Sequence, residues 1–499
     1  MQPGRAIAAP GLAITLSLLG ACTSLGPDYT EPDIEQEVQS GWSAPSSELL
    51  SAGPGPALDP RWWQAAFEDP ILNQLTEQAL QQNLTLRSAG LRVLQSQQQL
   101  AIAIGNQYPQ QQQITALAQR EQENGSRFSE YNVGFNLAWE LDFWGRFSRQ
   151  VESASAELDA SVANYDDAMV SLVAQVAQSY LVLRTFQNRL QIARANIALQ
   201  EESLRIAQAK LNAGDTSELD VDQAITLLQN TRAQVPALET SVQQTKNTLA
   251  LLLGEPPQTF NALATSTGDI PSVKASVALG MPQDLLRQRP DVRAAERNLA
   301  AQSAQIGFAV TELYPHFSIG GSIGTNAGET DDLFSNEGEA WNFFGSFEWN
   351  VFNYGRLESN VRLQDALFQQ LLEDYRFTVI QAQVDVENAI VAYLKSHEQV
   401  VDYKAAVISA QEAVKVSSAQ YENGLLDYNT VITTLNSLRQ QQDLLASVQG
   451  NVTTNLVQIY KSLGGGWQIR DQRDPVDLLP AATREAMIER TDAWEDVLE

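Results

Sequence analysis

The sequence predicts an α+β membrane protein with an internal duplication, in which each copy combines two β-strands with one long helical hairpin. One observation is a heptad seam, since an apolar residue stands at every seventh position from Val162 to Leu211. A second is that this seam recurs 210 residues later, from Leu372 to Tyr421. A third is that landmark residues follow at the same offset, namely Trp139 and Trp349, Gly145 and Gly355, Arg146 and Arg356, Gly214 and Gly424, and Gly254 and Gly464.

Each long seam is followed by a glycine and a shorter seam, which predicts that the helix folds back on itself. The shorter seams run from Val221 to Leu249 and from Val431 to Ile459. The first long arm, roughly residues 148 to 211, would span about 90 Å at 1.5 Å per residue. After the glycines at the two tips, Ser217 and Asp427 are expected to begin the returning helices. These tips are expected to lie farthest from the membrane.

The composition excludes several classes of function. A net charge of −28 leaves no basic surface to neutralise phosphates, which argues against nucleic acid binding. Two histidines and one cysteine allow neither a metal-ligand cluster nor an internal disulfide, so no cofactor is expected. The acidity is assigned to solvated faces or to an aqueous passage.

The N-terminal region has the features of a secretion signal. Residues 1–21 contain Arg5 and then an apolar run that leads into Leu19-Gly20-Ala21-Cys22. This tetrapeptide resembles a bacterial lipobox, which makes Cys22 the predicted lipid attachment site. The alternative is an ordinary signal peptide followed by an incidental cysteine. Residues 22–68 lack periodicity and are expected to form an extended tether.

In each copy a helical stretch precedes the strands. The first is expected from Asp69-Pro70 to about Gly105, and the second from Arg289-Pro290 to about Leu313. The strands themselves alternate between apolar and polar residues. The predicted strands cover residues 133–143, 317–323 and 347–351, with a weakly patterned one at 111–119.

Alternation over about ten residues fits a membrane β-strand, with one face toward lipid and the other toward water. A soluble half-buried sheet is the alternative. The secretion signal and the polar linkers at residues 121–131 and 325–341 favour a barrel, with these linkers outside the cell.

The predicted strands are too few to close a barrel within one chain, because about eight is the smallest workable number. The chain is therefore expected to oligomerise, and three chains would provide twelve strands and twelve long helices. The residues predicted to face the lumen are Asn136, Glu140, Glu348 and Asn350.

The repeat divides the chain into two units and several irregular segments. The predicted units cover residues 69–254 and 283–464, with a linker at 255–282 and an acidic tail at 465–499. The linker and the tail begin at equivalent points of the repeat. They are therefore expected to pack with the tether as an equatorial belt around the helices.

Two short motifs suggest enzymes, and both are rejected. Residues 320–324 match the Gly-x-Ser-x-Gly nucleophile elbow, which requires a helix directly after it, whereas another loop and strand are expected here. Residues 464–466 are glycines without the Lys and Ser or Thr of a phosphate-binding loop. No catalytic residue is predicted, and His397 is expected on the surface of a long helix.

The stretch from Met281 to Glu296, continued through Gly307 to Tyr314-Pro315, resembles the TolC/OprM family of outer-membrane factors, specifically the lipidated NodT-type branch. The resemblance covers nearly the whole chain. It implies a homotrimer with a β-barrel in the outer membrane and an α-barrel in the periplasm, which catalyses nothing. The implied partners are a periplasmic adaptor and an inner-membrane resistance-nodulation-division pump. The implied function is the passive exit duct for drugs or other small molecules.

The resemblance also implies functional residues at the hairpin tips. The implied adaptor-docking residues are Gly214, Asp215, Ser217, Gly424, Asp427 and Tyr428. The closed pore of the family is often narrowed by a ring of Asp with an apolar ring one turn away, and these positions align with Thr433 and Asn429 here, which departs from the family pattern. Asp220 and Asp222 are an alternative source of charge, although acids also occur near helix N-termini for structural reasons.

Two other functions stay open at this point. The duct could serve a protein-secretion transporter, or the chain could be a non-conducting periplasmic coiled-coil scaffold, which would have no use for the alternating strands. Opening of a duct is expected to require untwisting of the hairpins, because three copies of a heptad seam pack as a closed coil. The acidic balance predicts cation preference, provided that the charge faces the lumen.

Overall fold

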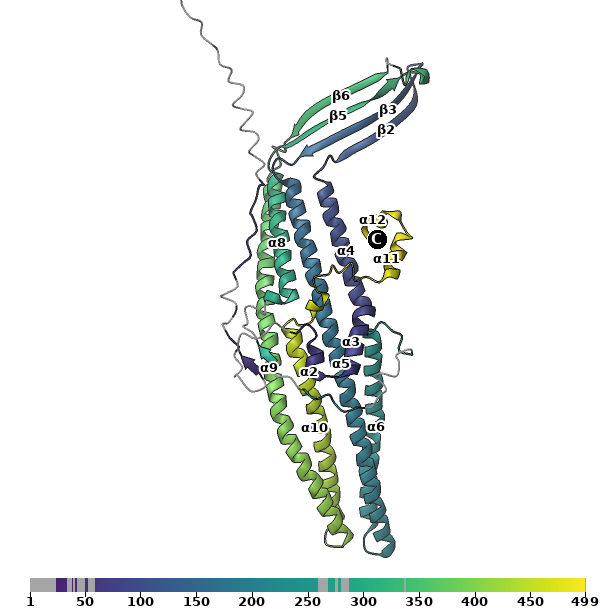
Figure 1. Ribbon diagram of the computed structural model, residues 1–499, viewed down its shortest axis with the longest axis vertical. Helices are drawn as coiled ribbons and strands as arrows, with labels where there is room; N and C mark the ends of the chain where they lie inside the picture. The colour runs from purple at the N-terminus through teal and green to yellow at the C-terminus, as the bar shows by residue number, and fades with distance from the viewer. Residues whose placement is uncertain are drawn as a thin grey trace, which may run out of the picture. The chain divides into compact units, whose positions relative to one another are not determined.

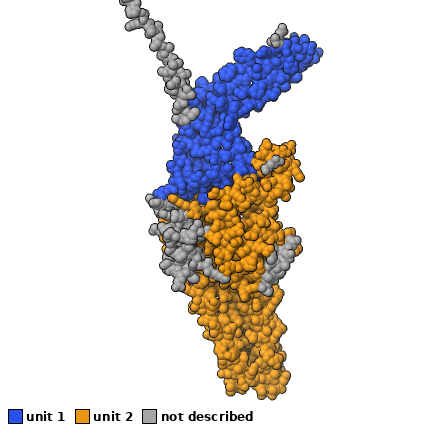
Figure 2. All heavy atoms as spheres, viewed as in Figure 1, with its two compact units in different colours: residues 1–33, 92–162, 293–377 blue, residues 34–91, 163–292, 378–499 orange. Residues whose placement is uncertain are grey.

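The computed structural model describes residues 24–33, 38, 41–42, 50–52, 59–258, 268–273, 277–279, 287–335 and 338–498. The chain divides into two compact units, each built from three stretches of sequence (Figure 2). Unit 1 comprises Met1–Asp33, Arg92–Val162 and Arg293–Phe377, and unit 2 comprises Ile34–Leu91, Ala163–Val292 and Thr378–Glu499. The predicted signal peptide and Cys22 lie outside the described residues.

Unit 1 contains an antiparallel sheet with the strand order β2-β3-β5-β6 (Figure 1). Its strands are β2 (Gln111–Glu123), β3 (Ser126–Leu141), β5 (His316–Ala327) and β6 (Glu339–Glu348). The two copies of the repeat meet at the centre, where β3 pairs with β5 in the register of Leu137 with Gly321. Among the described residues, β2 and β6 are edge strands with one neighbour each.

All four predicted strands are present, but most of their predicted boundaries are wrong, and β6 overlaps its predicted range of 347–351 only at Phe347 and Glu348. β2 and β3 are joined by Asn124-Gly125 alone, whose φ values of 49° and 85° match the two-residue hairpin turn that this dipeptide favours. Most of the predicted linker at residues 121–131 is therefore strand. β6 ends at Glu348, so Trp349 and Asn350 lie beyond the sheet although they continue the alternating pattern.

The predicted alternation gives the sheet two chemically different faces. On the first, here called the apolar face, Phe135 pairs with Ile323, which pairs with Trp341. On the second, here called the polar face, the neighbouring row reads Gln113, Asn136, Ser322 and Asn342 across the four strands. Asn136 donates to the Thr115 hydroxyl at 2.9 Å on this face.

Both predicted helical hairpins are present. The first pairs α5 (Arg146–Ala213) with α6 (Glu218–Leu252), and the second pairs α9 (Arg356–Glu422) with α10 (Tyr428–Ser462). None of the residues in the four heptad seams is exposed, so the seams mark the packed sides of the helices. No described helix combines the length and the apolar character needed to cross a bilayer.

The helical stretch before the first hairpin is broken, which the sequence did not predict. It forms α3 (Pro70–Gln82) and α4 (Leu84–Gly105), separated by Asn83, and α4 alone corresponds to α8 (Pro290–Thr311) of the second copy. Asn83 donates to the Leu252 carbonyl at 2.8 Å and accepts from the Leu86 amide at 2.8 Å, so it satisfies the end of α6 and the start of α4. In the second copy Arg289 takes this place and donates to the Ser462 carbonyl at 2.6 Å.

The remaining segments attach to the helices. In unit 1, Arg149 holds the segment 24–33 by donating to the Leu25 carbonyl at 3.0 Å and to Asp28 at 2.9 Å. In unit 2, β1 (Leu50–Ala52) pairs in parallel with β4 (Val277–Leu279). Arg470 of the C-terminal tail binds the buried Asp166 carboxylate at 2.8 and 3.2 Å. The other short helices are α2 (Trp62–Phe67), α11 (Ala481–Ile488) and α12 (Glu495–Leu498).

Candidate functional site

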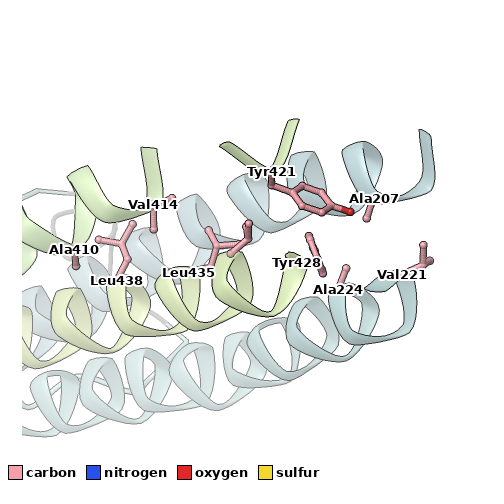
Figure 3. Close-up of a cluster of buried hydrophobic side chains, with 10 residues drawn as sticks. Ala207, Val221, Ala224, Ala410, Val414, Tyr421, Tyr428, Leu435 and Leu438 are labelled. Atoms are coloured by element: carbon pink, nitrogen blue, oxygen red, sulfur yellow. The ribbon is translucent and has the colours of Figure 1, made fainter. Parts of the chain in front are cut away.

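The tips of the two hairpins share one apolar core in unit 2, here called the tip core (Figure 3). Ala207 of α5 and Val221 and Ala224 of α6 contribute from the first hairpin. The second hairpin contributes Ala410, Val414, Tyr421, Tyr428, Val431, Leu435 and Leu438. Because residues from four helices are buried together, the two tips cannot separate without exposing apolar surface.

Polar contacts accompany this core. The hydroxyls of Ser203 on α5 and Tyr428 on α10 lie 2.9 Å apart and are buried. The Tyr421 ring lies 4.9 Å from the Tyr428 ring and 5.2 Å from the Lys210 ammonium, a distance suited to a cation–π interaction. Burial raises the pKa of both tyrosines, which keeps their hydroxyls protonated at neutral pH.

Further polar pairs join α5 to α10 along their length, so these antiparallel helices connect the two hairpins. Arg189 binds the Asp443 carboxylate through two hydrogen bonds of 2.7 and 3.0 Å. Asn196 donates to Gln442 at 2.7 Å, and Gln178 donates to Gln458 at 3.2 Å. A bidentate guanidinium–carboxylate pair is geometrically specific, so Arg189 and Asp443 fix the register of α5 against α10.

A groove of about 390 Å³ lies between the hairpins next to the tip core. Its apolar lining is Leu199, Ile206, Val414, Val431, Leu435 and Leu438. Its polar lining includes Glu202, Gln411, Lys415, Glu422 and Gln442. An apolar floor with a mixed polar rim is typical of a surface that receives a helix from another protein.

The structure places most of the predicted docking residues on the surface of the tips. Gly214 and Gly424 adopt positive φ values of 82° and 72° at the turns, and a side chain at either would meet open space. Asp215 and Ser217 are exposed as well. Asp427 is exposed and caps α10 by accepting from the Thr430 amide at 3.0 Å. Ser217 occupies the N-cap position of α6, so the helix begins where predicted, although the Ser217 side chain makes no cap hydrogen bond.

Tyr428 is the exception among the predicted docking residues. Its side chain is buried in the tip core and bonded to Ser203. The ring is therefore unavailable as an outer contact and instead supports the tip from within.

The predicted gate residues occupy two environments. Asn429 and Thr433 are exposed on α10 in a stripe of uncharged residues that continues with Asn436 and Gln440, and Arg439 lies beside this stripe and donates to Asn436 at 3.0 Å. Asp222 is exposed on α6. Asp220 is half-buried in the first turn of α6 and accepts a hydrogen bond from Thr216, which precedes the helix, as expected of a helix N-terminal acid.

A second group of functional interest lies in unit 1, where the sheet joins the helices. Glu140 accepts from Arg146 at 2.9 Å and contacts the His316 Nδ1 atom at 2.8 Å, and Arg146 also pairs with Glu312 at 3.0 Å. Aromatic rings lie nearby, with Trp144 at 4.8 Å from Phe143 and at 5.0 Å from Tyr314. Such a ring cluster at the end of a sheet is typical of the boundary between lipid and water.

Sequence reasoning missed the contacts that join the hairpins. Arg189 and Asp443 are 254 residues apart, and no local pattern relates them. Tyr428 could have been assigned to the core, because it precedes Val431, Leu435 and Leu438 at helical spacing. Among the described residues, no group of three or more histidine, cysteine or acidic side chains is arranged to hold a metal ion.

Comparisons with known proteins are consistent across sequence and structure. The family model for outer membrane efflux proteins matches residues 75–255 and 281–465. The pyoverdine export outer membrane protein OpmQ of Pseudomonas putida is 32% identical over 469 residues, which cover 92% of this chain and 97% of OpmQ. The probable outer membrane lipoprotein SilC of Salmonella typhimurium is 27% identical over 455 residues, 91% of this chain and 97% of SilC. The structure of the outer-membrane channel OprN superposes with a TM-score of 0.82 at 31% identity, over 89% of this chain and 100% of OprN.

Proposed function

Because the chain belongs to the outer membrane efflux protein family, we propose that it is the exit duct of a tripartite efflux system, which conducts small molecules passively to the exterior. The protein is located in the outer membrane and extends into the periplasm. The observation that carries this proposal is a sheet with one apolar face, one polar face and two open edges. That combination suits a segment of barrel wall between lipid and water.

The open edges support an oligomeric barrel. β2 and β6 run antiparallel to each other, so β6 of one copy can pair with β2 of the next in the same antiparallel pattern. Closure requires about eight strands or more, and three copies provide twelve. In unit 2, α9 leaves an apolar stripe exposed that suits the same assembly: Ile380, Val384, Val391, Val401 and Ile408. The duct is therefore a homotrimer.

Cys22 is the lipid anchor in this proposal. The chain's only cysteine follows an apolar run that is typical of a secretion signal. Acylation at Cys22 would attach the trimer to the outer membrane beside its barrel. SilC, whose name describes an outer membrane lipoprotein, matches most of this chain.

The groove beside the tip core is the docking surface for a periplasmic adaptor that links the duct to an inner-membrane pump. The exposed tip residues Gly214, Asp215, Ser217, Gly424 and Asp427 extend this surface. Lys415 and Glu422 at the groove rim offer charges of both signs for an amphipathic helical partner.

The gate lies at the tips, and the contacts between α5 and α10 hold it closed. Opening moves the α9–α10 hairpin away from the α5–α6 hairpin, which breaks the Arg189–Asp443 and Ser203–Tyr428 contacts. The uncharged stripe of Asn429 and Thr433 lines the constriction, and Asp220 and Asp222 add charge beside it. Cysteines at Asn429 that cross-link between copies should block export.

The decisive experiment reconstitutes the purified full-length chain in planar bilayers. Discrete ion conductance together with cross-linked trimers is expected, whereas silent monomers would contradict the proposal. A protein-secretion duct would conduct as well, so cross-linking of intact cells should identify the inner-membrane partner as an efflux pump. A non-conducting scaffold predicts neither conductance nor protease-sensitive loops at the cell surface.

A further inference from the structure

Two adjacent aromatic residues of β6 lie on opposite faces of the sheet. Phe343 pairs with Gly321 on the apolar face, in line with Trp341 and Phe347. It is 75% exposed in the single chain, as expected of a side chain that meets lipid. Phe344 pairs with Gly320 and therefore belongs to the polar face.

The Phe344 ring lies across the neighbouring strand β5. A Cβ atom added to Gly320 would come within 2.7 Å of Phe344 Cζ, which shows that the ring covers the Gly320 backbone. The same row contains Ala138 and Gln111, so no bulky side chain stands on the far side of the ring. Phe344 remains 45% exposed in this position.

The surroundings of Phe344 are polar. The adjacent row on one side contains Asn342 and Ser322, and the row on the other side contains Ser346 and Ser318. The other large apolar side chains on the described polar face, Leu117 and Phe128, pair with Asn132 and Glu121 toward the hairpin ends of the strands. Phe344 is therefore a lone aromatic ring near the ends that join the helices.

Packing over Gly320 explains the covered part of the ring but not the exposed part. An aromatic residue often shields a glycine on the next strand, and this contact alone would be a structural role. A polar side chain at position 344 would suit a wetted face better. The exposed ring is a surface on which aromatic solutes can stack and organic cations can bind.

We propose that Phe344 is a contact site on the lumen wall for aromatic organic cations in transit, with one such ring from each copy at the same level of the barrel. This inference rests on the proposed duct, since only a closed barrel turns the polar face into a lumen. The net charge of −28 favours entry of cations, which brings this class of solute to the ring. The site is shallow, so it would retard solutes without trapping them.

Cysteine accessibility tests the orientation of the ring. Phe344→Cys should react with a charged, membrane-impermeant thiol reagent, and Phe343→Cys should not, in reconstituted full-length protein. The wild-type chain, whose only cysteine is Cys22, is the labelling control. Equal reactivity at both positions, or reaction at 343 alone, would overturn the assignment of faces.

Channel block tests the contact itself, with tetraphenylphosphonium as the probe in planar bilayers. Phe344→Leu keeps an apolar side chain over Gly320 but removes the aromatic face, and it should raise the blocking concentration about threefold to tenfold. Phe344→Tyr keeps the ring, so the blocking concentration should equal that of the wild type. The same is expected of Phe343→Leu, which lies on the opposite face. If the blocking concentration in Phe344→Leu equals that of the wild type, the contact site is refuted, but the proposed duct is not. A wild-type protein that does not conduct would instead refute the duct.

Discussion

The Arg189–Asp443 pair gives the sharpest test of how the two hairpins are held together. The guanidinium makes bonds of 2.7 and 3.0 Å to the carboxylate, and the side chains are 27% and 37% exposed. Arg189→Asp places two carboxylates at this contact, and Asp443→Arg places two guanidinium groups there. Each single variant should favour the open duct, and the double variant should restore the closed one.

The magnitude follows from the geometry. Solvent screening at this partial exposure limits the bidentate pair to about 1 kcal/mol, and the like-charge pair costs about as much again. In each single variant, the closed state of a subunit is then destabilised by about 2 kcal/mol. This lowers the ratio of closed to open subunits roughly 30-fold, since about 1.4 kcal/mol is a factor of ten.

The assay is open probability in planar bilayers, together with sensitivity of cells to a bulky antibiotic that normally does not cross the outer membrane. Lys395→Asp is the matched control, because Lys395 pairs with Glu398 inside α9 rather than across the two hairpins. A double variant that conducts like Arg189→Asp alone would show that the pair does not hold the gate.

Four further outcomes are expected. Arg470→Ala removes two hydrogen bonds of 2.8 and 3.2 Å to the buried Asp166 carboxylate and should cost about 3 kcal/mol, seen as a lower melting temperature, whereas unchanged melting would refute this. Burial, and to a lesser extent Lys404, lowers the pKa of His397 below its ordinary 6.5. The stability that His397 contributes is therefore complete above pH 6.5 and is lost as the pH falls through the pKa of the folded state. In His397→Gln, the melting temperature should fall less on acidification than in the wild type. Gly324→Val should abolish detergent-resistant oligomers, because a Cβ there lies 2.4 Å from the Val133 carbonyl oxygen, while Gly345→Val, with its nearest atom at 4.0 Å, should assemble. Reversal potentials in a salt gradient should show cation preference, and anion preference would disprove that part of the reasoning.

The helices could be predicted from the sequence because their signal is local and periodic. The seam from Val162 to Leu211 marks the packed side of α5, and its copy at an offset of 210 marks that of α9. The break at Asn83 escaped prediction because its cause is a contact with Leu252, which is 169 residues away. Helical periodicity continues across the break and conceals it.

The strands and the site were only partly predictable. Alternation located the centre of β3, but only the Asn124-Gly125 dipeptide could have set its start. The tip glycines are exposed as predicted, whereas Tyr428 is buried because it continues the apolar spacing of α10. The polar pairs between α5 and α10 depend on how these two helices are aligned in the folded chain, and no local sequence pattern reveals that alignment.

The unpaired edge strands of the sheet are prone to aggregation before assembly. β2 and β6 offer rows of backbone amides and carbonyls that have no strand beside them on one side within the described sheet. Any extended peptide that the secreted chain encounters could pair with such an edge strand and start an aggregate. In the proposed trimer, a newly secreted copy would need a chaperone that shields these edges until two further copies bind. The yield of finished ducts would then depend on the supply of such chaperones more than on the strength of the long helices.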